Sequence, residues 1–307
     1  MESCSSGRVL SIQSHVVSGY VGNKAAVFPL QLLGFDVDPI NSVHFSNHTG
    51  FPNGFEGDVL QGDQLRAIMK GLERNDLLSD VEHLLTGYIG SASFLSAVLD
   101  VLQILRNRPN GKRLRYVCDP VLGDVGSGFY VPQELVQLFR DKVIPEANVV
   151  TPNQFEAEQL TGMTLNSVDD VKVACKALHD IGPSLVVITS VLLKDDKDDT
   201  ISVYASKRDE EKDTTELWCI QCPQLPGRYT GTGDLLSSLL LGHSAIENNI
   251  PKTLEVVMNT MSAVIKRTLE LSPDIPLDSD HPRELRLIQC KAIIENPPIE
   301  LKAQRIE

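Results

Sequence analysis

Residues 231–241 read GTGDLLSSLLL, a turn of small residues that runs directly into an apolar stretch. This pattern predicts a loop at the start of a helix, where unpaired backbone N–H groups and the helix dipole favour an anion such as phosphate. Asp234 places a carboxylate, a candidate proton acceptor, in the same turn. An anion site beside a base is what phosphoryl transfer to a hydroxyl requires. Glycine-rich turns also begin ordinary helices, so the rest of the chain must distinguish a functional site from a helix cap.

Strand and helix patterns alternate along the chain before this turn. Predicted strands cover residues 8–13, 36–43, 83–86, 114–118, 148–150 and 184–189, and predicted helices cover 23–33, 65–75, 93–106, 132–142, 154–161 and 167–180. A hairpin is predicted over 200–205 and 214–222, followed by helices at 234–247 and 252–271. This alternation indicates an α/β fold, a three-layer αβα sandwich with a central mostly parallel sheet.

The chain shows no internal repeat and no interdomain linker. We therefore expect residues 1–307 to form a single domain, with flexible tails at 1–7 and 298–307. The start of the chain lacks the apolar segment of a secretory signal, and no stretch reaches the length of a membrane span, so we expect a cytoplasmic protein with no membrane partner.

The charge balance and the cysteines exclude some functions. With a net charge of −13, the chain lacks the basic surface that nucleic-acid binding needs. Cys219 and Cys222 form a CxxC, which raises the alternative of a redox or zinc site. The residues around them alternate as in a strand, where positions three apart face opposite sides, so free thiols are the favoured interpretation.

Polar side chains follow most of the predicted strands at the point where each strand ends. Ligands of an open parallel sheet bind at the carboxyl ends of its strands. The strand-end residues are Ser14, Thr49, Tyr88, Asp119, Thr151, Asn153, Thr189 and Ser190. The nearby carboxylates of Asp119, Asp124 and Glu156 suggest Mg²⁺, a cation that prefers hard oxygen ligands, although Glu156 would equally serve as a helix cap.

Several common nucleotide-binding patterns are absent. The chain has no GxxxxGK[ST] phosphate loop and no HRD or DFG segment, which excludes Walker-type and protein-kinase sites. The stretch GYVGN at 19–23 has two glycines of a dinucleotide fingerprint but lacks the third. A small-molecule kinase is the class that remains.

The chain resembles the pyridoxal kinase family of the ribokinase superfamily over most of its length. The matching segments are SIQSHVVSGYVGN (11–23), FSNHTG (45–50), LTGYIG (85–90), VCDPVLGD (117–124), TPNQFEAEQLTG (151–162), VITS (187–190) and GTGD (231–234). The resemblance implies a ribokinase-like fold and ATP-dependent phosphorylation of the 5′-hydroxymethyl group of pyridoxal, pyridoxine and pyridoxamine, yielding pyridoxal 5′-phosphate and ADP in vitamin B6 salvage. Alternatives are a hydroxymethylpyrimidine kinase and a non-catalytic vitamin B6 binding protein on the same fold.

The resemblance also implies roles for individual residues. Asp234 would accept the proton of the substrate hydroxyl, and the N–H groups of Gly231, Thr232 and Gly233 would hold the transferring phosphoryl group. Substrate contacts would come from Ser14, Val21, Thr49 and Tyr88, and ATP contacts from Asp119, Asn153, Glu156, Thr189, Ser190 and Thr232. Asp124 and Glu156 would hold Mg²⁺, and Asp119, Thr151 and Thr189 would lie near a monovalent cation, K⁺ or Na⁺. Relatives are cytosolic homodimers.

Two segments depart from the family pattern. The segment 125–130 is short and glycine-rich here, and the corresponding segment forms part of a flap in relatives. Residues 224–230 are more polar than the usual lead-in to GTGD, and Arg228 is a candidate phosphate contact.

Overall fold

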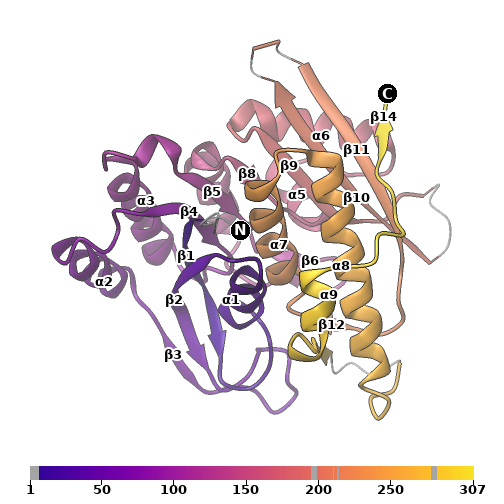
Figure 1. Cartoon of the computed structure of the whole chain (residues 1–307), viewed down its shortest axis with the longest axis horizontal. Coiled ribbons are helices and arrows are strands. Elements are labelled where there is room, and N and C mark those ends of the chain that lie inside the picture. The colour runs from indigo at the N-terminus through magenta and orange to yellow at the C-terminus, as the bar shows by residue number, and fades with distance from the viewer. Residues whose placement is uncertain (1–6, 195–198, 210, 213, 278–281) are drawn as a thin grey trace, which may run out of the picture.

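A ten-stranded sheet runs through the protein in the order β14-β11-β10-β9-β8-β5-β4-β1-β2-β3 (Figure 1). The computed structural model describes residues 7–194, 199–209, 211–212, 214–277 and 282–307. The six strands from β9 to β2 in this order pair in parallel, and the strands at both edges are antiparallel. The strands are β1 Arg8–Val16, β2 Asp36–Phe45, β3 Gly57–Val59, β4 Val81–Thr86, β5 Arg115–Cys118, β8 Val149–Val150, β9 Leu185–Val191, β10 Thr200–Asp209, β11 Thr214–Pro223 and β14 Gln304–Ile306.

Helices cover both faces of this sheet. One layer consists of α1 Asn23–Leu32, α7 Thr232–Ile246, α8 Ile250–Glu270 and α9 Lys291–Glu295 (Figure 1). The other contains α2 Gly62–Arg74, α3 Ala92–Arg106, α4 Glu134–Leu138, α5 Gln154–Thr161 and α6 Val168–Ile181. The predicted three-layer αβα sandwich is confirmed.

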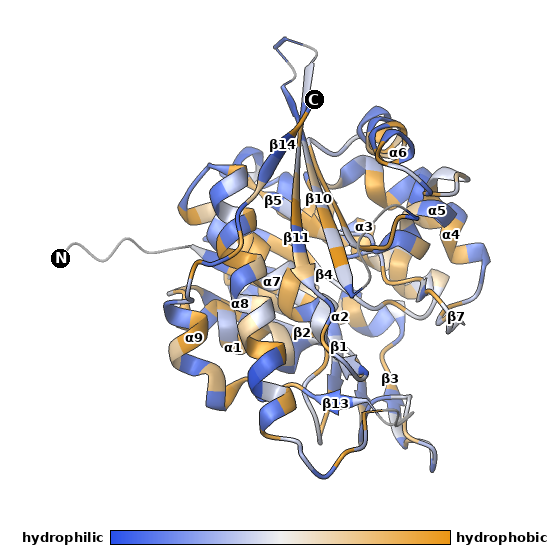
Figure 2. Ribbon diagram, turned by 90° about the vertical axis from the view of Figure 1, so that its right-hand side faces the viewer, coloured by the Kyte–Doolittle hydropathy of each residue, from blue (hydrophilic) through white to orange (hydrophobic). Residues whose placement is uncertain are grey.

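Alternating side chains of the central strands build two separate cores. Leu84 of β4 and Tyr116 of β5 pack in the core beneath α2, α3, α5 and α6, whereas Leu85 and Val117 pack in the core beneath α1, α7 and α8. In Figure 2 the hydrophobic colour follows these strands and the sides of the helices that face them. Because both faces are covered, the central strands are apolar on both sides, as parallel sheets require.

The two cysteines of the CxxC motif lie in different cores. Cys219 is buried in the first core and Cys222 in the second, so they sit on opposite faces of β11, as the alternation predicts. Neither forms a disulfide within the described residues, and burial raises the pKa of Cys222 to about 12. A thiol of this kind stays protonated and is a poor nucleophile or metal ligand.

Two short strand pairs that the sequence does not predict lie outside the ten-stranded sheet. β6 Gly123–Asp124 pairs with β7 Gly128–Phe129, so the glycine-rich segment 125–130 belongs to a small hairpin. β12 Tyr229–Thr230 pairs in parallel with β13 Arg283–Glu284, which anchors the polar lead-in to α7. Strands of two residues are too short to show a period in the sequence.

The segment 298–307, which the sequence predicts to be flexible, is attached to the sheet through β14, which pairs with β11. The Asn259 side chain accepts hydrogen bonds at 2.8 Å from the backbone N–H groups of Glu300 and Leu301 and donates to the Leu301 carbonyl. These partners lie more than forty residues away in the chain, so no local sequence pattern predicts these hydrogen bonds. The expected N-terminal tail lies outside the described residues except for Gly7.

We expect Asn259→Ala to release this segment. The variant leaves two backbone N–H groups without their acceptor, which should lower the free energy of unfolding by about 1–3 kcal/mol. Hydrogen exchange should accelerate in residues 298–307, and denaturant unfolding measures the loss. Asn75→Ala is the matched control, because Asn75 is exposed and donates a single hydrogen bond to Gly71 within its own helix. Equal effects from the two variants would show that Asn259 does not anchor the segment.

Candidate active site

The strand-end residues predicted from the sequence lie along one edge of the sheet. Their order in space follows the strand order: Thr189 lies near the end of β9, Thr151 follows β8, Asp119 follows β5, Tyr88 follows β4, Ser14 lies near the end of β1 and Thr49 follows β2. The backbone continues to pair beyond the strands, since Asp119 N–H donates to Thr86 O at 2.9 Å and Thr151 N–H to Cys118 O at 3.1 Å. This pairing holds the polar residues at fixed spacing.

Asp234 lies in the first turn of α7, near the middle of this edge. Its carboxylate accepts a hydrogen bond of 2.7 Å from the backbone N–H of Gly22, in the loop that follows β1. Desolvation raises the pKa of this half-buried carboxyl, and the Gly22 N–H opposes the shift. The bond fixes one carboxylate oxygen, so the carboxylate is held in place at the helix N-terminus.

Two glycines permit this contact. Gly231 has φ +81°, and a Cβ built on it would lie 2.0 Å from the Tyr20 carbonyl oxygen. Gly22 has φ +55°, and its Cβ would lie 2.0 Å from the Ser14 carbonyl oxygen. Only glycine combines a left-handed backbone with such close approach. The two motifs GYVGN and GTGD, more than two hundred residues apart in the sequence, are therefore packed backbone against backbone.

Two further carboxyl groups are buried at this edge, Asp119 next to Asp234 and Glu156 next to Asp119. Burial raises the pKa of Asp119 well above its usual range, and the neighbouring Glu156 and Asp234 raise it further. Burial also raises the pKa of Glu156 to about 8, although backbone N–H groups of Asn153, Leu122 and Gly123 donate hydrogen bonds to it. Among the described residues, no Lys, Arg or His side chain forms an ion pair with any of the three carboxylates.

After β8, the side chains of Asn153 and Glu156 are hydrogen-bonded within the protein, whereas the Thr151 hydroxyl is not. The Asn153 side chain caps α5 by accepting the Glu156 N–H at 2.9 Å, and it donates to the Gly123 carbonyl at 2.8 Å. The helix-cap alternative for Glu156 is thus present, because its carboxylate accepts the Asn153 N–H at 2.8 Å. The buried Thr151 hydroxyl forms no hydrogen bond with described residues, yet it lies close enough to Asp119 to lower the pKa of that carboxyl.

Ser190, the penultimate residue of β9, is exposed and strained. Ser190 has φ +54°, a left-handed conformation that non-glycine residues rarely adopt. It follows Thr189, whose backbone N–H donates to the Pro152 carbonyl at 2.9 Å. Strain of this kind concentrates at ligand sites.

An apolar wall lies at the other end of the edge. Val21 and Tyr88, both predicted to pack on a substrate ring, are partly buried against the cluster of Val16, Val43 and Phe45. Thr49 lies in the exposed loop just beyond this wall. The structure thus brings together the residues predicted for the substrate, at the opposite end of the edge from those predicted for ATP.

One residue at this site gives no signal in the sequence. Glu284 of β13 accepts a 2.8 Å hydrogen bond from the Tyr20 N–H, and its other carboxylate oxygen lies 3.4 Å from His48 Nε2. The His48 Nδ1 accepts the Gly50 N–H at 3.1 Å, which fixes the ring in the loop that carries Thr49. Glu284 therefore connects the Val21 loop to the Thr49 loop.

The β6–β7 hairpin lies near the ATP end. Asp124 is partly exposed, and its carboxylate accepts the Val125 N–H at 2.8 Å. Burial raises the pKa of Asp124, while the positive charge of Arg228 lowers it. The two segments that depart from the family pattern are thus electrostatic neighbours.

Known proteins are similar to this chain over nearly its whole length. The family model described as phosphomethylpyrimidine kinase matches residues 63–275. A pyridoxal kinase of Arabidopsis thaliana is 52% identical over 97% of this chain and 94% of its own, and one of Sus scrofa is 40% identical over 97% and 95%. The structure of a pyridoxal kinase of Leishmania donovani in complex with ADP and pyridoxamine is 34% identical and superposes with a TM-score of 0.90, covering 98% of this chain and all of that one.

These likenesses place the protein among small-molecule kinases with a ribokinase-like fold. More narrowly, the chain belongs to the pyridoxal kinase family.

We expect Gly231→Ala to disrupt the contact between GTGD and the Tyr20 loop. Gly162→Ala is the matched control, because Gly162 has a similar φ of +72° but open space around its Cβ position. Gly162→Ala should lose about 1–2 kcal/mol of stability from left-handed strain, and Gly231→Ala should lose more because its Cβ also meets the Tyr20 carbonyl oxygen. Only Gly231→Ala should also lose turnover, on the order of 100-fold, because it displaces the loop that holds Asp234. Denaturant unfolding and an ATP-consumption assay measure the two effects, and equal turnover in both variants would contradict this account.

Proposed function

We propose that this protein is an ATP-dependent pyridoxal kinase that phosphorylates the 5′-hydroxymethyl group of pyridoxal, pyridoxine and pyridoxamine. The observation that carries the proposal is the Asp234 carboxylate, held by the Gly22 N–H at the N-terminus of α7. A base at a helix N-terminus lies where a hydroxyl has to lose its proton and a phosphoryl group gains charge. The full-length similarity to pyridoxal kinases supports this choice of substrate.

Each group of the site has a defined task in this reaction. Asp234 accepts the proton of the substrate hydroxyl as the oxygen attacks the γ-phosphorus of ATP, and the bond from that phosphorus to ADP breaks. The N–H groups of residues 231–233 stabilise the negative charge that the phosphoryl oxygens carry during transfer. The substrate ring packs between Val21 and Tyr88, with Ser14 and Thr49 at its polar substituents.

The ATP half of the site would be formed by the residues that follow β5, β8 and β9. They are Asp119, Asn153, Glu156, Thr189, Ser190 and, from α7, Thr232. The Asn153 side-chain oxygen already accepts the Glu156 N–H as a helix cap. Asn153 would therefore contact the nucleotide while keeping this hydrogen bond.

The carboxylates of the site fit bound cations. Glu156 and Asp124 would hold Mg²⁺, and Asp119, Thr151 and Thr189 would lie near K⁺ or Na⁺. Asp119 and Glu156 are buried without a cationic partner among the described residues, and the Thr151 oxygen has no hydrogen bond there. In the described part of the chain, no three His, Cys, Asp or Glu side chains converge as a complete metal site. Mg²⁺ sites commonly combine one or two carboxylates with water and phosphate oxygens, and the ion neutralises phosphate charge.

The location and assembly of the protein are also part of this proposal. We infer a cytosolic homodimer from the family resemblance. No helix in the described residues has the length and apolar character needed to cross a membrane. Sedimentation equilibrium of the purified protein tests the dimer.

We expect Asp234→Asn to lower kcat on the order of 10²–10⁴-fold, because the amide cannot accept the proton. ATP binding should persist, since the amide oxygen can still accept the Gly22 N–H and keep the loop in place. Asp141→Asn, at an exposed position that is not part of the candidate active site, is the charge-matched control and should turn over normally. Near-normal turnover of Asp234→Asn would overturn its assignment as the base.

Turnover of the unaltered protein on pyridoxal, pyridoxine, pyridoxamine and hydroxymethylpyrimidine separates the candidate functions. A higher kcat/KM on the B6 vitamers is expected. Preference for hydroxymethylpyrimidine would replace the proposal with the alternative kinase, and vitamer binding without ATP consumption would indicate a non-catalytic binder.

We expect stabilisation by Mg²⁺ to increase with pH. Because the pKa of Glu156 is raised from 4.5 to about 8 in the folded protein, its contribution to stability is greatest at low pH and is lost as the pH rises toward 8. Mg²⁺ binds the deprotonated carboxylate, so it should offset that loss and raise the melting temperature more at pH 8.5 than at pH 6. Glu156→Gln should remove the pH dependence, and a Mg²⁺ effect independent of pH would contradict the prediction.

A further inference from the structure

A polar cavity lies at the edge of the sheet opposite the candidate active site. Its volume is about 350 Å³, within the range of small-molecule sites. It lies at the amino ends of β5, β8 and β9, with the loop before β5 on one side and the connection between α7 and α8 on another. None of the residues discussed for the kinase reaction lines it.

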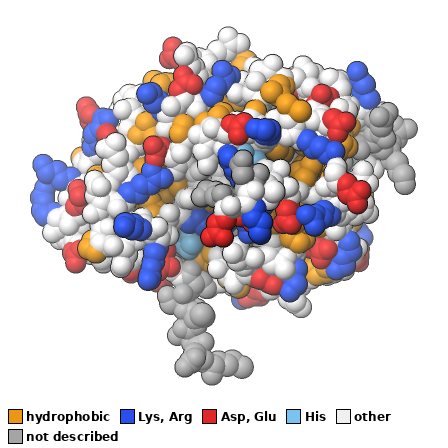
Figure 3. Space-filling view, turned by 90° about the horizontal axis from the view of Figure 1, so that it is seen from above, with side chains coloured by type: hydrophobic (Ala, Val, Ile, Leu, Met, Phe, Trp, Pro, Cys, Tyr) orange, Lys and Arg blue, Asp and Glu red, His pale blue; other side chains and the backbone are white. Residues whose placement is uncertain are grey.

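The charge of this cavity differs from that of the protein. Its described lining contains four cationic side chains, Lys112, Arg113, Arg115 and Lys207, and no Asp or Glu. The whole chain has a net charge of −13. Figure 3 looks onto the end of the molecule where α7 turns into α8, and there Lys and Arg side chains are interspersed with acidic ones. An all-cationic lining on an acidic protein is therefore a local feature.

The cations at the cavity lack carboxylate partners. Among the described residues, no carboxylate forms an ion pair with Lys112, Arg113 or Arg115, and Lys207 reaches only the Asn248 amide oxygen, at 3.4 Å. Arg115 is partly buried, and burial lowers the pKa of its guanidinium. A desolvated cation without an anion is costly, and a bound anion would remove that cost.

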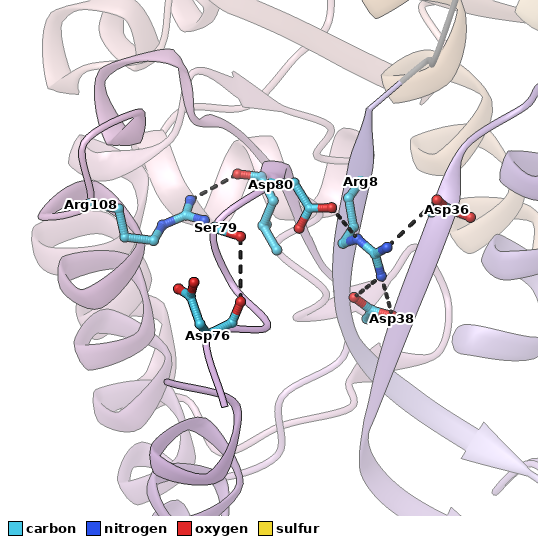
Figure 4. Close-up of polar contacts among 8 residues, drawn as sticks. Arg8, Asp36, Asp38, Asp76, Ser79, Asp80 and Arg108 are labelled. Carbon is cyan, nitrogen blue, oxygen red and sulfur yellow. Dashed lines mark hydrogen bonds and ion pairs between the residues drawn. The ribbon is translucent and has the colours of Figure 1, made fainter. Parts of the chain in front are cut away.

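A different arginine at the same edge of the sheet does have carboxylate partners. Arg8, at the start of β1, is surrounded by Asp36, Asp38 and Asp80, with N–O distances of 3.7, 3.1 and 3.1 Å (Figure 4). A cation at the amino end of β1 is thus neutralised within the protein, whereas Arg115 at the amino end of β5 is not.

A neutral donor completes the cavity. The Asn148 side-chain oxygen accepts the Tyr116 N–H at 2.7 Å, which leaves its amide NH₂ as a donor. The Ser184 hydroxyl also lines the cavity, but it donates its hydrogen to the Asn148 carbonyl at 3.2 Å. Cationic groups with an added neutral donor and no carboxylate match a phosphate dianion.

We propose that this cavity binds a phosphate dianion, either free or as the phosphoryl group of a small metabolite, at a site separate from the kinase centre. Lys112 and Arg113 lie at its exposed rim, and Arg115 lies deeper. The volume leaves room for an organic group attached to the phosphate. The proposal stands on the cavity and its charges, and it does not depend on the kinase assignment.

Isothermal titration calorimetry tests the site in the full chain. The titrants are inorganic phosphate, glycerol 3-phosphate and glycerol, at constant ionic strength and with saturating ADP to occupy the kinase centre. Both phosphates should bind and glycerol should not. Tighter binding of glycerol 3-phosphate would assign the site to phosphorylated metabolites, and equal binding would assign it to free phosphate.

Variants localise the binding. Lys112→Gln combined with Arg113→Gln should weaken phosphate binding about 10- to 100-fold, by loss of two charge-assisted contacts. Lys70→Gln combined with Arg74→Gln, which removes two exposed cations from α2, is the matched control and should bind as the unaltered protein does. Arg115→Gln should weaken binding further. Absence of phosphate binding, or equal binding by the two double variants, would overturn the proposal.

Discussion

Three carboxyl groups that share one edge of the sheet impose the main constraint on this protein. Asp119 and Glu156 are buried, Asp234 is half-buried, and burial raises the pKa of each. Like charges in a region of low dielectric repel one another, so the fold has to hold them together by other means. It does so with backbone: Asp234 is bound by the Gly22 N–H and Glu156 by three N–H groups. Two apolar cores supply the stability that allows this arrangement.

The edge that carries these carboxyl groups has two chemically different halves. The carboxylates and the cap of α5 lie at one end, and the apolar wall formed with Val21 and Tyr88 lies at the other. Asp234 lies between them, because α7 packs against β4 and β5 in the middle of the sheet. A charged phosphate donor needs polar groups and cations around it, whereas an aromatic acceptor needs apolar contacts. A parallel sheet provides both, since each strand end can carry its own side chain without altering its neighbours.

The sequence predicts the parts of this structure that follow from local patterns. The α5 helix is predicted to the residue, and the strand-end positions follow from alternation, because parallel strands end at a common edge. The tie from Glu284 to Tyr20 and the attachment of residues 300–301 to Asn259 were not predictable, since each joins distant segments through a single polar side chain. The two glycines of GYVGN also have a role that the sequence alone does not reveal. Their spacing suggests a dinucleotide fingerprint, whereas Gly22 serves a left-handed turn against Ser14.

The Glu284 contact has a consequence for how activity arises during folding. It joins positions 264 residues apart in sequence, so closing it requires nearly the whole chain to be in place. The entropy of closing so long a loop is recovered only after the intervening layers have packed. A chain whose sheet has formed but whose segment around β13 has not docked would have the first core and the carboxylates, yet its second core would lack Leu285 and Leu287 and its two substrate loops would be untethered. Enzymatic competence would then appear as one of the last events of folding, later than the gain of secondary structure.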